Sequence, residues 1–359
     1  MYYSCGKYSI KNMVYFTPSP ITGDEIAGAE KIRQIIGNIP DAFNTTFYLA
    51  RWWRAYNGDL ERIERNMKDL FDHRRILGYD QIETELLQTK LEIAKKTFER
   101  FCISKVALHR SANNVCVFFQ RMVTNDIEEI SKVVPFSYVL HSYFILQEAF
   151  TRAQLETEKA TGSPAAVASI LDLSEVNTTA LLNPSSVSAQ FVRLIVKIWA
   201  DYFAETLVPA VYGGKWRDES GYAEEPELVC QKPIKIIPEH YYNPDLLWRK
   251  YGFQEVPLKT IGSIKRKQTF EVEKICMKES QILLWDFTVT NDIEFSIVKM
   301  EEEKEEQVVW PKITLTSLRV PEQGSIACRQ GKYKIRFKNP NRSIIPIKLH
   351  YVITLCPDN

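Results

Sequence analysis

The sequence predicts a multi-domain protein of α/β plus all-β class, with a helical N-terminal region, a small α/β layer and a C-terminal antiparallel β-sandwich. Its 359 residues favour two or three domains over one. Apolar residues recur at helical spacing over residues 24–98, and short apolar runs then alternate with helices up to about residue 215. From residue 268 onward, apolar and polar residues alternate as they do in half-exposed strands.

The N-terminal region carries the start signals of helices. Residues 22–24 predict one helix start, and Asp59 predicts another because it follows an Asn-Gly turn and its carboxylate can cap free backbone N–H groups. Beyond Asp59, apolar residues return every three to four positions at Ile63, Met67, Leu70 and Phe71. Residues 81–100 are expected to continue as a charged amphipathic helix.

The middle of the chain predicts a strand–helix–strand–helix unit. Residues 115–119 and 165–173 are short apolar runs, and helices are expected at about 135–160 and 185–207. This order implies parallel pairing of the two strands in an α/β layer. Residues 216–262 predict a linker packed on what precedes it. Six strand segments follow, and the acidic run at 301–306 is interpreted as a solvated hairpin loop.

Composition excludes several classes of function. Lys and Arg total 46 and Asp and Glu total 45, so the formal net charge is +1, which argues against bulk electrostatic binding of nucleic acid. The seven cysteines are isolated and odd in number, as expected for reduced thiols in the cytoplasm. No apolar run reaches the roughly 18 residues of a membrane span, and the N-terminus is a poor signal peptide, so membrane contact is expected to be peripheral.

No catalytic or metal-binding pattern is present. The sequence lacks a Walker loop and the HExxH, GxSxG and GxGxxG motifs, and its five histidines show no metal-ligand spacing. His141 is interpreted as a packed helix residue, and Asp172 as a cap or ion-pair residue at the end of a strand. We therefore expect a protein that is not an enzyme and that holds no metal or cofactor.

Four stretches carry a resemblance to a known family. FYLARWWRAYNGDLERIERNMKDLFDHRRILGYD (47–80) is similar to the helical cap of CRAL-TRIO proteins that have a C-terminal GOLD domain. Residues 115–184, with VCVFFQRM and LLNPSS, resemble the first half of the lipid-binding domain, and the tripeptide at 212–214 resembles its terminal Gly-Gly turn. Residues 240–356 resemble a GOLD domain, most clearly in WDFTVTNDIEFSI. The resemblance covers about nine-tenths of the chain.

The resemblance implies an apolar pocket with a mixed sheet as its floor and a mobile gate helix above one lipid, such as phosphatidylinositol. Burial of each lipid methylene stabilises such a complex by about 0.8 kcal/mol. One departure matters: only residues 208–211 separate Leu207 from Tyr212, whereas a parallel crossover needs at least roughly 10 residues. The gate and one pocket strand are therefore not expected in their usual form, through true loss, alternative splicing or a faulty gene model.

Three residues are carried over as lipid-binding candidates: Phe118, Ser169 and Glu205. The first two fall on the apolar runs at positions that resemble pocket-lining positions, and core packing is the equal alternative. Glu205 matches a Glu of phosphatidylinositol-binding members, but its partners have no counterpart here. The favoured alternative for Glu205 is a polar helix stripe with an internal ion pair, made of Arg193, Lys197, Asp201 and Glu205. Arg51 and Arg54 are expected to pair with acids rather than with lipid phosphates.

The expected domains are an N-terminal extension (1–22), a helical region (23–100), a truncated lipid-binding domain (101–215), a linker (216–262) and a GOLD domain (263–359). The first hypothesis is an intracellular lipid-binding or lipid-transfer protein that visits a membrane surface, Golgi or other internal membranes included. The second is an adaptor that binds a protein partner through an exposed edge of its sandwich. In a third, loss of a central strand leaves the chain poorly folded.

Overall fold

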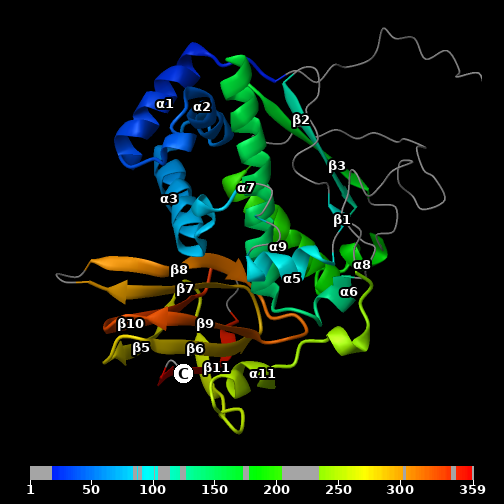
Figure 1. Cartoon of the computed structure of the whole chain (residues 1–359), viewed down its shortest axis with the longest axis vertical. Helices are drawn as coiled ribbons and strands as arrows, with labels where there is room; N and C mark the ends of the chain where they lie inside the picture. Colours follow the sequence, from blue (N-terminus) through cyan, green and yellow to red (C-terminus); the bar gives the residue numbers. More distant parts are fainter. Residues whose placement is uncertain are drawn as a thin grey trace, which may run out of the picture.

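The computed structural model describes residues 18–83, 87, 91–100, 102–103, 114–121, 127–172, 178–203, 234–301, 305–340 and 345–357. Three parts are visible in Figure 1: a group of N-terminal helices, a small sheet beside a long helix, and a β-sandwich below them. Residues 1–17 of the expected N-terminal extension and residues 204–233 lie outside the described residues. The mixed helix and strand layout with a C-terminal all-β region agrees with the predicted class.

The N-terminal helices begin where the capping signals predict. They are α1 (Gly23–Ile36), α2 (Thr46–Ala55) and α3 (Leu60–Leu77), with short 3-10 turns η2 (Asp41–Phe43) and η3 (Tyr79–Gln81). Thr22 and Glu25 form a reciprocal capping box at α1. The Asp59 side chain accepts a hydrogen bond from the Arg62 N–H at α3, and Gly78 ends that helix in a left-handed conformation.

The middle of the chain forms the predicted α/β layer. Its elements are α5 (Glu92–Phe98), β1 (Cys102–Ile103), β2 (Val115–Arg121), α6 (Ile127–Ile130), α7 (Phe136–Thr161), β3 (Ala166–Asp172), α8 (Thr178–Leu182) and α9 (Val187–Tyr202). Strands β2 and β3 are parallel, and β1 adds to β2 in the antiparallel sense. The long helix α7 is the crossover between the two parallel strands. The prediction of parallel pairing is therefore confirmed.

The C-terminal part is a sandwich of two four-stranded antiparallel sheets, ordered β5-β10-β7-β8 and β4-β11-β6-β9. The strands are β4 (Thr260–Ile264), β5 (Thr269–Cys276), β6 (Gln281–Val289), β7 (Ile293–Met300), β8 (Glu306–Leu315), β9 (Glu322–Cys328), β10 (Gly331–Lys338) and β11 (Ile347–Pro357). Each of the six predicted segments contains a strand, but the segment predicted at 312–320 is strand only to Leu315, and its strand begins earlier, at Glu306. Two further strands, β4 and β9, were not predicted, and β4 spans the expected domain boundary at residue 262.

Aromatic side chains fill the space between the two sheets. Phe287 on β6 meets Phe295 on β7 at 4.9 Å and Phe337 on β10 at 5.0 Å between ring centroids. Trp285 lies over Gly324 so closely that a Cβ atom at that glycine would stand 2.2 Å from the indole ring. Gly324 is therefore required by the close approach of the tryptophan, and the strand alternation of β9 is interrupted there.

The described part of the expected linker packs on the sandwich as well as on what precedes it. It contains η6 (Pro238–His240) and α11 (Asp245–Lys250). Trp248 on α11 is buried, and its indole N–H donates to Asp286 Oδ2 of β6 at 3.3 Å. The backbone N–H of Tyr242 donates to the Lys132 carbonyl at 2.8 Å. Residues 234–258 thus bridge the two parts, which corrects the expectation of packing on the preceding part alone.

Candidate functional site

The candidate site is the sheet formed by β2 and β3, because two of the three predicted lipid-binding residues lie on it. Phe118 and Ser169 are direct partners in the parallel register of these strands. The structure therefore brings the two positions side by side, although 51 residues of chain separate them in the sequence. The side chain of Ser169, the side chain of Asp172 and the whole of Glu205 lie outside the described residues.

One face of this sheet is closed by α7. Phe118 is 1% exposed, and its ring stacks on Phe150 of α7 with centroids 3.8 Å apart. On the same face, Cys116 Sγ lies 3.4 Å from Thr157 Oγ1 of α7. These residues belong to a closely packed apolar cluster that also holds Val167 of β3. Phe118 is thus packed as a core residue between the strand and α7.

The opposite face of the sheet follows from strand geometry. Successive positions along a strand belong to opposite faces, so positions 117 and 119 of β2 belong to the face that is turned away from α7. In Figure 1 the sheet lies at the margin of the described molecule, with α7 on its inner side. A ligand that uses this sheet as its floor must therefore approach from the face of positions 117 and 119.

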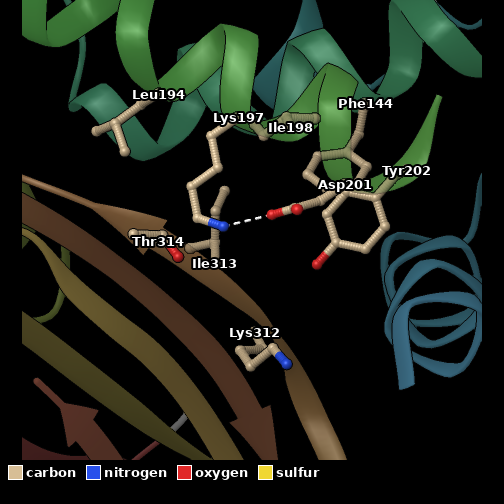
Figure 2. A pocket seen from close by; sticks show the side chains of 9 residues that line it. All are labelled: Phe144, Leu194, Lys197, Ile198, Asp201, Tyr202, Lys312, Ile313 and Thr314. Carbon is tan, nitrogen blue, oxygen red and sulfur yellow. Dashed lines mark hydrogen bonds and ion pairs between the residues drawn. The ribbon is translucent and has the colours of Figure 1, made fainter. Parts of the chain in front are cut away.

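The predicted polar stripe on α9 faces the sandwich. Lys197 pairs with Asp201 on the same helix, as predicted, and Arg193 reaches across to Asp292, which precedes β7. Figure 2 shows the small cavity between α9 and β8 at this seam, with the Lys197–Asp201 pair at its centre and Tyr202 and Lys312 beside it. Its volume of about 20 Å³ holds one water molecule and no lipid chain.

Both arginines of α2 pair with acids. Arg54 does so within the helical cap, as predicted, whereas the partner of Arg51 lies on α7 and not in the cap, where it was expected. Arg54 Nε donates to Glu25 Oε1 of α1 at 2.6 Å, and this pair lowers the pKa of Glu25 to about 2. Arg51 forms a buried ion pair with Glu158 near the end of α7. Glu158 also accepts the Ala165 backbone N–H at 3.0 Å, just before β3. The helical cap is thereby joined to the crossover, and neither arginine is free for a lipid phosphate.

A buried histidine pair lies at the seam between the helices and the sandwich. His73 Nε2 of α3 is 2.9 Å from His141 Nδ1 of α7, and His73 Nδ1 is 2.9 Å from the Tyr79 hydroxyl. His141 packs edge-on against Trp310 of β8, with ring centroids 5.4 Å apart. Burial lowers the pKa of His141 to about 3 and holds the pKa of His73 well below its usual value. Both rings are therefore neutral at physiological pH.

This histidine pair makes stability depend on pH. The unfolded chain takes up protons at both histidines below about pH 6.5, whereas the folded chain does not, so stability falls as pH falls from about 6.5 toward 3. Each histidine contributes a slope of up to about 1.4 kcal/mol per pH unit. We expect His141→Gln to reduce the slope of unfolding free energy against pH, in urea titrations between pH 5 and 7; an unchanged slope would contradict the buried neutral pair.

Glu322 of the sandwich caps the long helix of the α/β layer. The helix α7 begins after Pro135 and has no side-chain cap of its own. Glu322 Oε1 accepts the Phe136 N–H at 3.0 Å, and Oε2 accepts the Ser137 N–H at 3.2 Å. Burial raises the pKa of Glu322 to about 7, and the two N–H donors act in the opposite direction. Sequence reasoning missed this contact, because 186 residues separate the partners.

Within the described ranges, no group of three or more His, Cys, Asp or Glu side chains is arranged to hold a metal ion. Nor does any helix among the same residues have the length and apolar character that crossing a bilayer requires. The described features of the site are thus the packed face of the β2–β3 sheet and the polar contacts between the helices and the sandwich.

The chain is similar to one curated protein over nearly its whole length. A Caenorhabditis elegans protein described as a CRAL-TRIO domain-containing protein is 23% identical over 398 residues, which cover 94% of this chain and 97% of the relative. No family model matches the chain. The aligned stretch is longer than the 359 residues present here, so the relative contains residues without a counterpart in this chain. This similarity supports the CRAL-TRIO resemblance.

Two of the solved structures that match the chain cover about a quarter of it. The Yersinia pseudotuberculosis-derived mitogen is 12% identical with a TM-score of 0.21, covering 27% of this chain and 84% of that protein. A periplasmic inhibitor of g-type lysozyme from Aeromonas hydrophila is 15% identical with a TM-score of 0.19, over the same shares. At these scores the likeness supports no inference.

Proposed function

We propose that this chain binds one lipid without chemical conversion and transfers it between membranes, and that it carries the lipid on the face of the β2–β3 sheet away from α7. The observation that carries the proposal is the similarity to a CRAL-TRIO protein over 94% of the chain. The parallel strand pair with a helical crossover, which the same resemblance implies, supports it. We place the protein in the cytoplasm, in contact with internal membranes.

The position of the ligand follows from the packing of α7. Where the structure describes the inner face of the sheet, the stacked rings of Phe118 and Phe150 occupy it. The sequence has Val and Phe at positions 117 and 119, which belong to the other face by strand alternation, and these apolar residue types suit an acyl chain. The proposed ligand contacts on β2 are therefore positions 117 and 119 instead of Phe118. Phosphatidylinositol is the first ligand to test, because the resemblance extends to members that bind it.

The C-terminal part is proposed to be a GOLD domain. Its two four-stranded antiparallel sheets form a complete sandwich with an aromatic core, as the resemblance implies. The two parts share one apolar core and are joined by the Glu322 cap and by the Arg193–Asp292 pair. The sandwich is accordingly proposed to hold α7 and α9 in place beneath the ligand.

Native mass spectrometry of the whole chain after incubation with phosphatidylinositol tests the proposal. We expect one lipid per chain in the wild type and loss of that species in Phe119→Asp, because a carboxylate on the outer face opposes burial of an acyl chain. Phe118→Leu is the matched control on the inner face: it should lower stability by about 1 kcal/mol and leave lipid occupancy unchanged. Equal occupancy in the wild type and in Phe119→Asp would contradict the proposed position of the lipid.

A further inference from the structure

The sandwich has a free edge opposite the helices. In one sheet the edge strands are β5 and β8, and in the other they are β4 and β9. The β8 and β9 edges face the helical part: Lys312 of β8 pairs with Asp69 of α3, and Glu322 of β9 caps α7. Figure 1 shows β8 beside the helices and β5 at the far side of the same sheet. The β4 and β5 edges therefore point away from the contact with the helices.

A basic turn connects these two edge strands. Lys265, Arg266 and Lys267 follow one another between β4 and β5, and all three are exposed. The adjacent strand β11 adds the exposed Lys348, whose register partner on β4 is Ser263. Within the described ranges, these four side chains form no ion pair. The next acid along β5, Glu271, is held by Arg336 at 2.6 Å and does not neutralise the turn.

The turn is held rigidly by the backbone and by Asn339. The Gln268 N–H donates to the Lys265 carbonyl at 3.1 Å, and Lys267 adopts a left-handed conformation with φ of 59°. Asn339 is fully buried: its N–H donates to the Gln268 carbonyl at 2.9 Å and its side-chain amide to the Ile264 carbonyl at 3.0 Å. The three basic side chains are therefore presented together from an ordered support.

Large apolar side chains are exposed beside the basic turn. Ile261 on β4 is 68% exposed, and Ile345 is 76% exposed two residues before Ile347, the register partner of Ile264. Exposed apolar residues next to unneutralised basic residues are the composition of peripheral membrane surfaces, where the apolar groups enter the interface and the cations meet anionic headgroups. We define the basic edge as residues 265–267 with Ile261, Ile345 and Lys348.

We propose that the basic edge docks the chain on anionic phospholipid bilayers. This inference rests on the proposed function, since it supplies the membrane contact that a lipid-transfer protein needs. The positive charge of the edge is complementary to phosphatidylserine and phosphoinositide headgroups, and the net charge of +1 shows that the basic excess is local. The basic edge lies on the sandwich and the proposed lipid site on the β2–β3 sheet, so docking and lipid occupancy can be measured separately.

Vesicle co-sedimentation of the whole chain tests this surface. We expect binding to phosphatidylcholine vesicles that contain phosphatidylserine, weak binding to phosphatidylcholine alone, and loss of binding as salt is raised. Lys265→Glu, Arg266→Glu and Lys267→Glu combined should weaken binding on the order of a hundredfold or more. Ile261→Ser with Ile345→Ser should weaken binding while its dependence on salt persists.

The matched control reverses three other exposed lysines on separate elements: Lys159→Glu, Lys235→Glu and Lys278→Glu. It has the same net charge as the basic-edge variant and should bind vesicles far better. Equal binding by the two variants overturns the proposal. A wild type that does not bind anionic vesicles also overturns it, and would favour a protein partner that adds a strand to β4. Lipid occupancy by native mass spectrometry should persist in the basic-edge variant. Vesicle binding without any lipid occupancy would refute the lipid-carrying function and keep the docking surface.

Discussion

Replacement of Glu148 by Ala is expected to lower the free energy of unfolding by about 3–5 kcal/mol, the usual cost of leaving a buried charge without its partner. Glu148 on α7 is 2% exposed and forms ion pairs with Arg74 of α3 and with Arg152, whose Nε donates to Glu148 Oε1 at 2.6 Å. Arg152 in turn donates to the Tyr79 and Ile82 carbonyls at 2.7 and 2.6 Å. Glu148 therefore joins α3, η3 and α7.

Urea unfolding followed by circular dichroism measures this effect. Glu64→Ala is the control, because Glu64 forms an exposed i,i+4 pair with Lys68 and its loss should cost no more than about 0.5 kcal/mol. Replacing Arg74 and Glu148 together by Met and Leu should recover part of the loss, since the buried Arg74 charge is then removed rather than orphaned, while Arg152 keeps its two carbonyl acceptors. A Glu148→Ala variant as stable as Glu64→Ala would show that the ion pairs do not join the helices.

Replacement of Glu322 by Ala is expected to cost about 2–4 kcal/mol. The substitution removes the cap of α7 and leaves the Phe136 and Ser137 N–H groups buried without an acceptor. Because Glu322 belongs to β9 and the helix to the α/β layer, the loss should appear first as faster hydrogen exchange in the first turn of α7. Glu322→Gln should lose less stability, since its side-chain amide oxygen can still accept a hydrogen bond from α7.

The pH dependence of the Glu322 effect has a defined sign. The folded pKa of about 7 exceeds the ordinary value of 4.5, so the stability from this shift is fully present below pH 4.5 and is lost as pH rises toward 7. The advantage of the wild type over Glu322→Gln should therefore shrink between pH 4.5 and 7. Glu255→Ala, at an exposed glutamate before β4, is the control and should change neither stability nor exchange. Slow exchange at Phe136 and Ser137 in Glu322→Ala would contradict the capping role.

Local sequence patterns predicted the elements that are determined by residues a few positions away. The Asp59 cap, the Gly162 stop of α7 and the alternation of β10 all lie within a few residues of what they determine. The ion pair between Lys197 and Asp201 was predictable for the same reason, since four residues on a helix bring two side chains together. Such features made the parallel β2–β3 pair and six of the sandwich strands predictable.

Features that depend on distant partners were not predictable in this way. The strand β9 contains Gly324 because Trp285 of another strand lies over it, so its alternation is broken and it was missed. The contact of His73 with His141 joins residues 68 positions apart, and neither histidine has a local motif. A strand pattern shows which residues share a face but not which face a helix covers. The packing of Phe118 against α7 could therefore not be predicted from the pattern alone.

Photo-crosslinking with a lipid that carries a diazirine in its acyl chain tests the central claim most directly. After crosslinking of the whole chain and peptide mapping, we expect labels on β2 and β3, at residues 115–121 and 166–172. Phe119→Asp should abolish these labels, and Phe118→Leu should keep them. Labels confined to α7, or a pattern that Phe119→Asp does not alter, would contradict a lipid held on the outer face of this sheet.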